Sequence, residues 1–144
     1  MTKIGYTTGV FDLFHIGHLN VIRSARLECD HLIVGVTTDE LCLQEKQIAP
    51  IIPFIERVAI VQSIRWVDAV VPQVSYDKLE AWHILKFNMV FVGSDWQGTD
   101  RWTEIERKMK AVGVIVRYLP YTKHTSSTEL RRALEAMRPP VPDN

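Results

Sequence analysis

The chain lacks an excess of charge of either sign. Its 144 residues include 17 lysines and arginines and 17 aspartates and glutamates, so the formal net charge is zero. Such a protein creates no long-range field that would draw nucleic acid or an acidic membrane surface towards it. We therefore expect neither as a partner, and any phosphate binding must depend on local groups.

Cysteines and long apolar runs are scarce as well. Cys29 and Cys42 do not form a metal-like pair, and two thiols are too few for a disulfide scaffold. No stretch approaches the ~20 apolar residues of a membrane span. The polar residues within 5–8 also interrupt any signal-peptide pattern. These absences favour a cytoplasmic protein with reduced, buried thiols.

The chain does contain enough apolar sequence for one core. It is 47% hydrophobic and 24% charged, which is typical of a soluble globular protein, and its length suits a single domain. We find no internal repeat, linker or second domain. We expect one domain over residues 1–137 and a flexible, proline-rich tail over residues 138–144.

Strand-like and helix-like segments alternate along the chain. Residues 41–53 are expected to be an irregular connector, because Pro50 and Pro53 disfavour a helix. The alternation predicts an α/β fold, namely a Rossmann-like, doubly wound parallel sheet of about five strands. Continuous apolar runs predict strands at 4–8, 31–37, 67–71, 88–93 and 114–119, and helical spacing predicts helices at 19–27, 53–65, 76–86 and 101–112, with a last helix after residue 126.

The most informative stretch, residues 9–18, lies where the first strand gives way to a helix. There an α/β protein presents unpaired N–H groups and the positive end of a helix dipole to a phosphate. His15 and His18 are three residues apart, so both imidazoles face one side of the first helical turn. Gly9 and Gly17 allow a sharp turn and a close approach. The alternative is that the histidines only cap the helix.

Two further polar segments follow predicted strands and so lie at the same edge of the sheet. Asp95 and Trp96 stand in a loop with glycines on both sides, which is typical of a ligand loop, although Trp96 could instead pack into the core. Residues 125–128 carry four hydroxyls before the last helix. Ser126 and Glu129 fit a capping box, but four hydroxyls exceed what one cap needs, which indicates a second phosphate cradle.

Residues 15–18 match the H-x-G-H signature of the nucleotidyltransferase superfamily, and residues 9–18 resemble its cytidylyltransferase branch, most closely the glycerol-3-phosphate cytidylyltransferases. The loop at Asp95 and Trp96 is similar to the G-D-D-W-x-G loop of that group, with Ser94 in place of the first acid. The segment 121–127 is similar to its R-T-x-G-I-S-T segment. There Tyr121 replaces the arginine, so a bidentate phosphate ligand is missing.

The resemblance implies transfer of CMP from CTP to a small phosphorylated alcohol, with release of pyrophosphate. Glycerol 3-phosphate is the first candidate acceptor, and the CDP-activated product would serve cell-wall or capsule synthesis. It also implies Mg²⁺ bound mainly through the triphosphate, with no certain protein ligand, and a homodimer. The alternatives are an adenylyltransferase of the FMN or phosphopantetheine type and a catalytically weak CTP-binding regulatory module. Asp68 is implied to lie near the site or the subunit interface.

The resemblance also assigns roles to single residues. The implied catalytic residues are His15, His18, Lys46 and Arg57; the nucleotide-binding ones are Thr8, Gly9, Val10, Phe11, Asp12, Gly17, Asp95, Trp96, Thr122, Thr125, Ser126, Ser127 and Thr128; and the acceptor-binding ones are Tyr121, Lys123 and His124.

The departure at Tyr121 gives a first test. If this position faces the nucleotide, the variant Tyr121→Arg changes the affinity for CTP, because a guanidinium can bind a phosphate with two hydrogen bonds. Calorimetric titration of both proteins with CTP measures the effect. Unchanged affinity would mean that the segment has another use in this chain.

Overall fold

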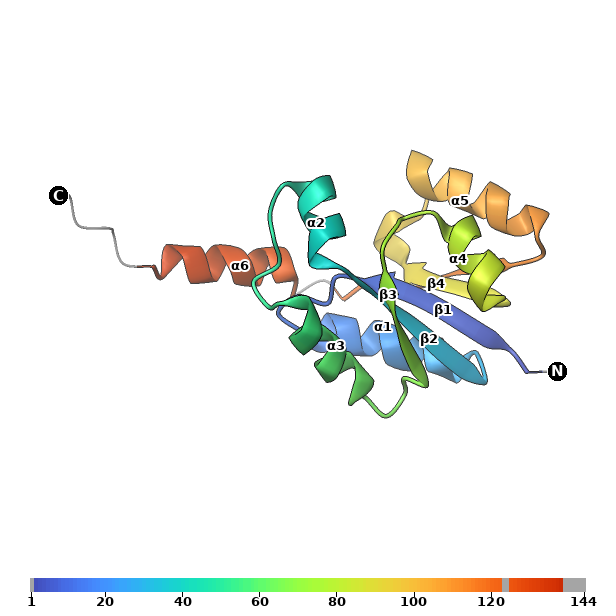
Figure 1. The fold of residues 1–144 in the computed structure, drawn as a ribbon, viewed down its shortest axis with the longest axis horizontal. Helices are drawn as coiled ribbons and strands as arrows, with labels where there is room; N and C mark the ends of the chain where they lie inside the picture. The colour runs from blue at the N-terminus through green and yellow to red at the C-terminus, as the bar shows by residue number, and fades with distance from the viewer. Residues whose placement is uncertain (1, 123–124, 139–144) are drawn as a thin grey trace.

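A parallel sheet of five strands runs through the computed structural model, which describes residues 2–122 and 125–138 (Figure 1). The strands are β1 (Ile4–Gly9), β2 (His31–Thr37), β3 (Ala69–Gln73), β4 (Met89–Gly93) and β5 (Ile115–Leu119). Their spatial order is β3-β2-β1-β4-β5, and every ladder is parallel. The predicted fold class is confirmed. The helices are α1 (Ile16–Leu27), α2 (Asp39–Lys46), α3 (Phe54–Gln62), α4 (Lys78–Leu85), α5 (Asp100–Ala111) and α6 (Ser127–Ala136).

Helices cover both faces of the sheet, which explains the continuous apolar runs in its strands. On one face α1 and α3 bury Ile22 and Val61 against Leu32 and Val34 of β2. On the other face α4 and α5 lie together, and Met109 packs with side chains that include Tyr6 and Val90 (Figure 1). The core is thus divided into two layers by the sheet.

The chain order reverses between β1 and β4, which are neighbours in the sheet. From β1 the chain proceeds outward through β2 to β3, and after the crossover it proceeds in the other direction from β4 to β5. Open parallel sheets bind ligands at such a reversal, beyond the carboxyl ends of the strands. The segment after β1, which contains both histidines, and the 3₁₀ turn η1 (Ser94–Trp96) after β4 both lie there.

The prediction of a connector over residues 41–53 is wrong in its first part, because α2 occupies Asp39–Lys46. The hydroxyl of Thr38 caps this helix by accepting a hydrogen bond from the Leu41 N–H (3.2 Å). Two acidic residues follow the cap and favour the positive end of the helix dipole. Thr38 and these two acids are typical of a helix start. Pro50 and Pro53, on which the prediction of a connector rests, lie beyond the end of the helix.

The third strand also differs from its prediction, since Pro72 lies inside β3 and does not end it. β3 is an edge strand that pairs with β2, and an edge position tolerates the missing proline N–H. Asp68, just before β3, lies at the amino edge of the sheet, where its carboxylate accepts hydrogen bonds from Arg26 Nε (2.9 Å) and the Leu32 N–H (2.8 Å). Asp68 therefore lies away from the histidines, and the other expectation, that it lies at a subunit interface, stays a prediction.

Helix α6 extends away from the sheet, and none of its residues is buried (Figure 1). Of the tail predicted for residues 138–144, positions 139–144 lie outside the described residues. Within the described part of the chain, no helix has the length and apolar character needed to cross a membrane.

Candidate active site

Imidazoles cap the start of α1. His15 is the N-cap residue, and its Nδ1 accepts a hydrogen bond from the Gly17 N–H (3.0 Å). The Nδ1 of His18 accepts one in return from the His15 N–H (3.3 Å). This is a capping box built from two histidines in place of a hydroxyl and a carboxylate. An accepting Nδ1 carries no proton, so the neutral rings carry theirs on Nε2.

The two rings are also packed against each other and against aromatic neighbours. The ring centroids of His15 and His18 are 3.9 Å apart, and His18 lies 5.3 Å from Phe11 and 5.2 Å from Phe14. Burial lowers the pKa of His18 to about 4, with a further lowering by His15 and an opposing effect of Asp12. Burial also lowers the pKa of His15. Near pH 7 both imidazoles are therefore neutral, each with one Nε2–H to donate.

The glycines predicted to matter here make room for these rings. A Cβ on Gly17 would lie 2.8 Å from Cε1 of His15, which is too close for the ring to fold back onto its own helix. A Cβ on Gly9 would lie 3.0 Å from two carbons of the Phe11 ring. Phe11 itself has a left-handed backbone, with φ at 56°. The strand end and the first helical turn are thus shaped around the aromatic rings.

Most of the predicted binding residues line one hollow at this edge of the sheet, with a volume of about 270 Å³, which we call the histidine hollow. Trp96 is 45% exposed on its wall, so the alternative of a core tryptophan is wrong. The predicted residues that line the histidine hollow are Thr8, Gly9, Phe11, His15, Gly17, His18, Asp95, Trp96, Tyr121, Thr122, Thr125, Ser126 and Ser127.

The start of α6 meets the start of α1 in this hollow. Ser126 caps α6 by accepting a hydrogen bond from the Glu129 N–H (3.0 Å), which confirms one of the two hydrogen bonds of the predicted capping box. The Ser127 hydroxyl donates to the carbonyl of Asp12 (2.6 Å), and Asn20 Nδ2 donates to Thr122 Oγ1 (3.1 Å). Asn20 was missed because a polar residue on a predicted helix gives no signal by itself. Two helix N-termini, which attract anions, therefore face one space.

A second hollow adjoins the first and shares Phe11, His18 and Ser127 with it. Lys46, the last residue of α2, lies on its wall and is exposed. Val10, Asp12 and Thr128 line it as well. Two of the predicted acceptor-binding residues, Lys123 and His124, lie outside the described residues.

Asp12 does not offer its carboxylate to a ligand, contrary to the expectation of a nucleotide contact. The side chain is buried, and its oxygens accept hydrogen bonds from the N–H groups of Leu13 (3.1 Å), Ile51 (2.8 Å) and Ile52 (2.8 Å). The fourth donor is the guanidinium of Arg131 (2.7 Å) on α6. Asp12 thus joins the histidine loop to the α2–α3 connector and to α6.

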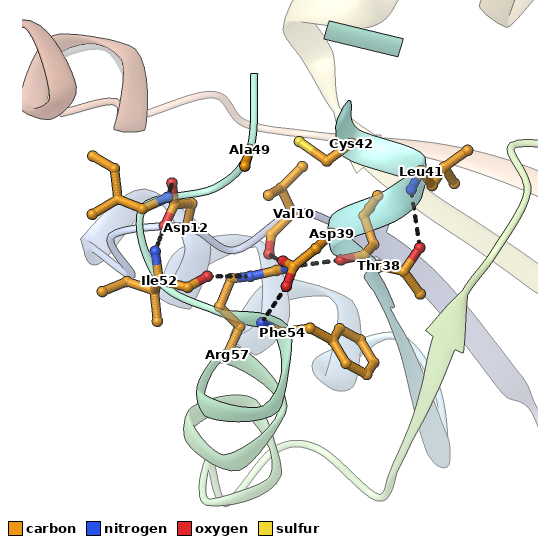
Figure 2. A network of polar contacts seen from close by, with 12 residues as sticks. Val10, Asp12, Thr38, Asp39, Leu41, Cys42, Ala49, Ile52, Phe54 and Arg57 are labelled. Atoms are coloured by element: carbon orange, nitrogen blue, oxygen red, sulfur yellow. Dashed lines mark hydrogen bonds and ion pairs between the residues drawn. The ribbon is translucent and has the colours of Figure 1, made fainter. Parts of the chain in front are cut away.

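Arg57 likewise departs from the expectation that it faces the phosphates. It has no exposed surface, and its guanidinium donates to the carbonyls of Ile52 (2.8 Å), Val10 (2.7 Å) and Thr37 (2.7 Å). It also forms an ion pair with Asp39 (2.6 Å), as Figure 2 shows. The carbonyl ends of β1 and β2 hold this side chain inside the protein, so Arg57 positions the loops around the site.

The site combines two helix N-termini and neutral imidazole donors at the switch point of a parallel sheet, which is typical of α/β proteins that bind nucleotides. Comparison with known proteins specifies the class. The family model described as cytidylyltransferase-like matches residues 6–133, so the chain belongs to that family and is a nucleotidyltransferase.

Relatives cover most of the chain. It is 32% identical over 133 residues to the glycerol-3-phosphate cytidylyltransferase of Bacillus subtilis, covering 91% of this chain and 96% of that protein. It is also 32% identical to the FAD synthase of Pyrococcus horikoshii, covering 88% of this chain and 86% of the relative. The solved structure of a lipopolysaccharide core biosynthesis protein from Thermoplasma volcanium has the same fold, with a TM-score of 0.71 and 24% identity over 87% of this chain and all of that one.

The histidine cap predicts a pH dependence of stability. The folded protein favours the neutral form of His18, so its contribution is present above pH 6.5 and is lost as the pH falls towards about 4. At 1.36 kcal/mol per pKa unit the loss reaches about 3 kcal/mol. The comparison variant is His18→Asn, whose amide oxygen can replace Nδ1 as the acceptor but does not titrate. Urea unfolding of both proteins at pH 7 and pH 4 measures the loss in the free energy of unfolding. Equal acid sensitivity of the two proteins would contradict the lowered pKa of the buried His18.

The buried guanidinium gives a second prediction. Arg57→Met leaves three carbonyls without their donor and Asp39 without its partner, which should lower the free energy of unfolding by about 3–5 kcal/mol. Arg57→Lys should recover only part of this, because an ammonium cannot reproduce the planar fork. Urea unfolding measures the free energy of unfolding of both variants. Wild-type stability of Arg57→Met combined with weakened CTP binding would instead place Arg57 on the nucleotide.

Proposed function

We propose that the chain is a cytidylyltransferase that transfers CMP from CTP to a small phosphorylated alcohol, with glycerol 3-phosphate as the first candidate. The observation that carries the proposal is the pair of neutral imidazoles at the start of α1, whose Nδ1 atoms are engaged in the cap while both rings line the histidine hollow. Only Nε2–H is left for a ligand. Such donors suit a phosphate chain at the N-terminus of a helix.

In the proposed reaction an oxygen of the acceptor phosphate attacks the α-phosphorus of CTP. A new P–O bond forms, the bond to the β-phosphate oxygen breaks in line with it, and pyrophosphate leaves with the electron pair. Because the nucleophile is already an anion, the protein needs no strong general base. Catalysis depends on positioning and on hydrogen bonds that strengthen as charge develops.

His15 and His18 would donate from Nε2 to the phosphoryl oxygens, and the N–H groups at the starts of α1 and α6 would add fixed positive dipoles. Lys46, exposed on the neighbouring wall, would bind the β- and γ-phosphates. Asp95 and Trp96 would contact the nucleoside from η1. Arg57 and Asp12 act through the backbone, because their side chains hold the loops that carry these groups.

The residues around the site fit a Mg²⁺ ion that enters as part of the Mg²⁺–CTP substrate. Within residues 2–122 and 125–138, no three His, Cys, Asp or Glu side chains gather to hold a metal ion. The buried carboxylate of Asp12 is occupied by N–H donors. Mg²⁺ readily keeps phosphate and water ligands with few from the protein. We therefore propose that the triphosphate holds it.

A second candidate is adenylyl transfer from ATP. It is supported by the identity with the FAD synthase, which equals that with the glycerol-3-phosphate cytidylyltransferase. The cytidylyltransferase proposal draws additional support from the matched family model. The two differ in the base, which the loop at Asp95 and Trp96 would contact.

Pyrophosphate release with Mg²⁺ tests the proposal, crossing CTP and ATP against glycerol 3-phosphate, ethanolamine phosphate and FMN. We expect release with CTP and one phosphorylated alcohol. Release only with ATP would support the second candidate. Binding of CTP without release on any acceptor would favour a regulatory module.

The imidazoles should also be indispensable for turnover. His15→Ala or His18→Ala should lower kcat about a hundredfold, as loss of one charge-stabilising donor does. The control is His83→Ala, which removes an exposed imidazole from α4. Rates are compared after circular dichroism has confirmed the fold. Rates of the α1 variants within twofold of the control would refute the assignment.

A further inference from the structure

One hydrogen bond ties the segment after β5 to α1 at the wall of the histidine hollow. Asn20, in the second turn of α1, donates from Nδ2 to Oγ1 of Thr122 (3.1 Å), which lies 102 residues further along the chain. Thr122 lines the histidine hollow. The proposed nucleotide contacts give Asn20 no role, although this bond determines how the Thr122 side chain meets the hollow.

The orientation of the Asn20 amide is fixed from its other end. Arg23, one turn further along α1, donates from Nη2 to Oδ1 of Asn20 (3.0 Å). A guanidinium has no acceptor atom, so the amide oxygen must face Arg23 and the amide NH2 must face Thr122. The guanidinium itself lies over the ring of Trp66, 5.8 Å from its centroid. The amide therefore cannot turn over without losing both hydrogen bonds.

This fixed amide determines what the Thr122 hydroxyl can do. A threonine hydroxyl has one proton and two lone pairs, and the Asn20 amide occupies one lone pair. The hydroxyl proton must therefore point away from Asn20. Within residues 2–122 and 125–138, no protein group accepts this proton. It is available to an acceptor in the histidine hollow, such as a phosphoryl oxygen.

Thr122 also lies beside the first turn of α1. A Cβ built on Gly17, between the two histidines, would lie 3.6 Å from Cβ of Thr122. His15 and His18 line the same hollow, and each keeps an Nε2–H for a ligand. The three side-chain donors thus lie around one helix N-terminus, which is where a phosphate is favoured.

We propose that Asn20 and Arg23 are positioning residues that turn the Thr122 hydroxyl towards the phosphate chain of the nucleotide, an inference that rests on the proposed function. The guanidinium, the amide and the hydroxyl form two hydrogen bonds in series, from Nη2–H to Oδ1 and from Nδ2–H to Oγ1. Such a series polarises its last member and makes the final O–H a stronger donor. The charge of Arg23 thus acts on the phosphate without touching it.

A purely structural tie between α1 and the segment after β5 would need this contact but not its direction. Asparagine and aspartate have the same shape, and both keep an oxygen for Arg23. A carboxylate has no proton to donate, so in Asn20→Asp the Thr122 hydroxyl must donate to it and loses its proton as a contact for a ligand. The substitution therefore reverses one hydrogen bond and keeps the tie.

Calorimetric titration with CTP tests this direction. Asn20→Asp should raise the dissociation constant for CTP about tenfold or more, as loss of a hydrogen bond to a charged group does, while the midpoint of urea unfolding does not fall. The control Asn88→Asp adds the same charge at the amino edge of the sheet and keeps the acceptor for the Ile4 N–H, so its affinity should stay within twofold of the wild type. Affinity within twofold in Asn20→Asp would overturn the inference.

Variants of Thr122 separate the hydroxyl from the added charge. Thr122→Val should weaken CTP binding about tenfold, and Thr122→Ser, which keeps the hydroxyl, should stay within threefold of the wild type. In the Thr122→Val background, Asn20→Asp should weaken binding less than threefold further, because no hydroxyl proton remains to be diverted. An equal loss from Asn20→Asp in both backgrounds would overturn the inference by assigning the effect to charge repulsion.

The part played by Arg23 is tested in the same two backgrounds. Arg23→Met releases the amide oxygen, so it should weaken CTP binding about threefold when Thr122 is present and should have no further effect in Thr122→Val. An equal effect in both backgrounds, or unchanged affinity in Arg23→Met alone, would contradict the series of hydrogen bonds.

Pyrophosphate is the second probe, and it separates this inference from the proposed function. It lacks a base, and its affinity for the same proteins should follow the same order because the contact is to phosphate. If CTP and pyrophosphate bind but no acceptor releases pyrophosphate, the proposed transfer fails and these titrations still decide the inference. If Asn20→Asp weakens the binding of neither ligand, the inference fails while the transfer is still measurable. A wild type that binds neither ligand would refute both.

Discussion

The reciprocal hydrogen bonds between the histidine rings and the backbone of the first turn of α1 determine what the site can do. Each ring uses Nδ1 to satisfy an N–H that the start of a helix would otherwise leave unpaired. The cap fixes the tautomer, and the aromatic packing around His18 keeps it uncharged near neutral pH. The site therefore presents two oriented N–H donors without the cost of burying two like charges 3.9 Å apart.

Buried ionic groups hold the loops around this cap. Arg57 joins the ends of β1 and β2 to the connector before α3, and Asp12 joins the histidine loop to the same connector (Figure 2). Asp12 also binds Arg131 of α6. Both side chains have most of their hydrogen-bonding capacity filled by the backbone, which is the condition under which a buried charge is tolerated. Breaking either anchor would loosen several segments of the site at once, because the segments share these residues.

The sheet, its carboxyl edge and the gathering of polar segments there could be predicted from the sequence. Apolar runs indicate strands such as β2, and the carboxyl ends of parallel strands must lie at the same edge of the sheet. The environments of single side chains could not be predicted in this way. Nothing local distinguishes Arg57, which is buried, from an exposed cation, and the partners of Asp12 at Ile51 and Arg131 are 39 and 119 residues away.

The same reasoning explains the error over α2. Helix formation there depends on a cap at Thr38 and on a buried contact of Cys42, whereas the prolines that argued against a helix lie beyond its end. Lys46 is the last residue of this helix and lies on the wall of the second hollow, and its contact with the phosphates stays a prediction. Lys78, the first residue of α4, is the opposite case, since a helix over residues 76–86 was predicted but the burial of this lysine was not.

Nitrogen-15 NMR of histidine-labelled protein most directly tests the claim that the cap sets the state of the imidazoles. We predict that both His15 and His18 are Nε2–H tautomers near pH 7, that His18 stays neutral down to about pH 5, and that CTP shifts both Nε2 resonances. An Nδ1–H tautomer for either ring, or titration of His18 near pH 6.5, would contradict the account.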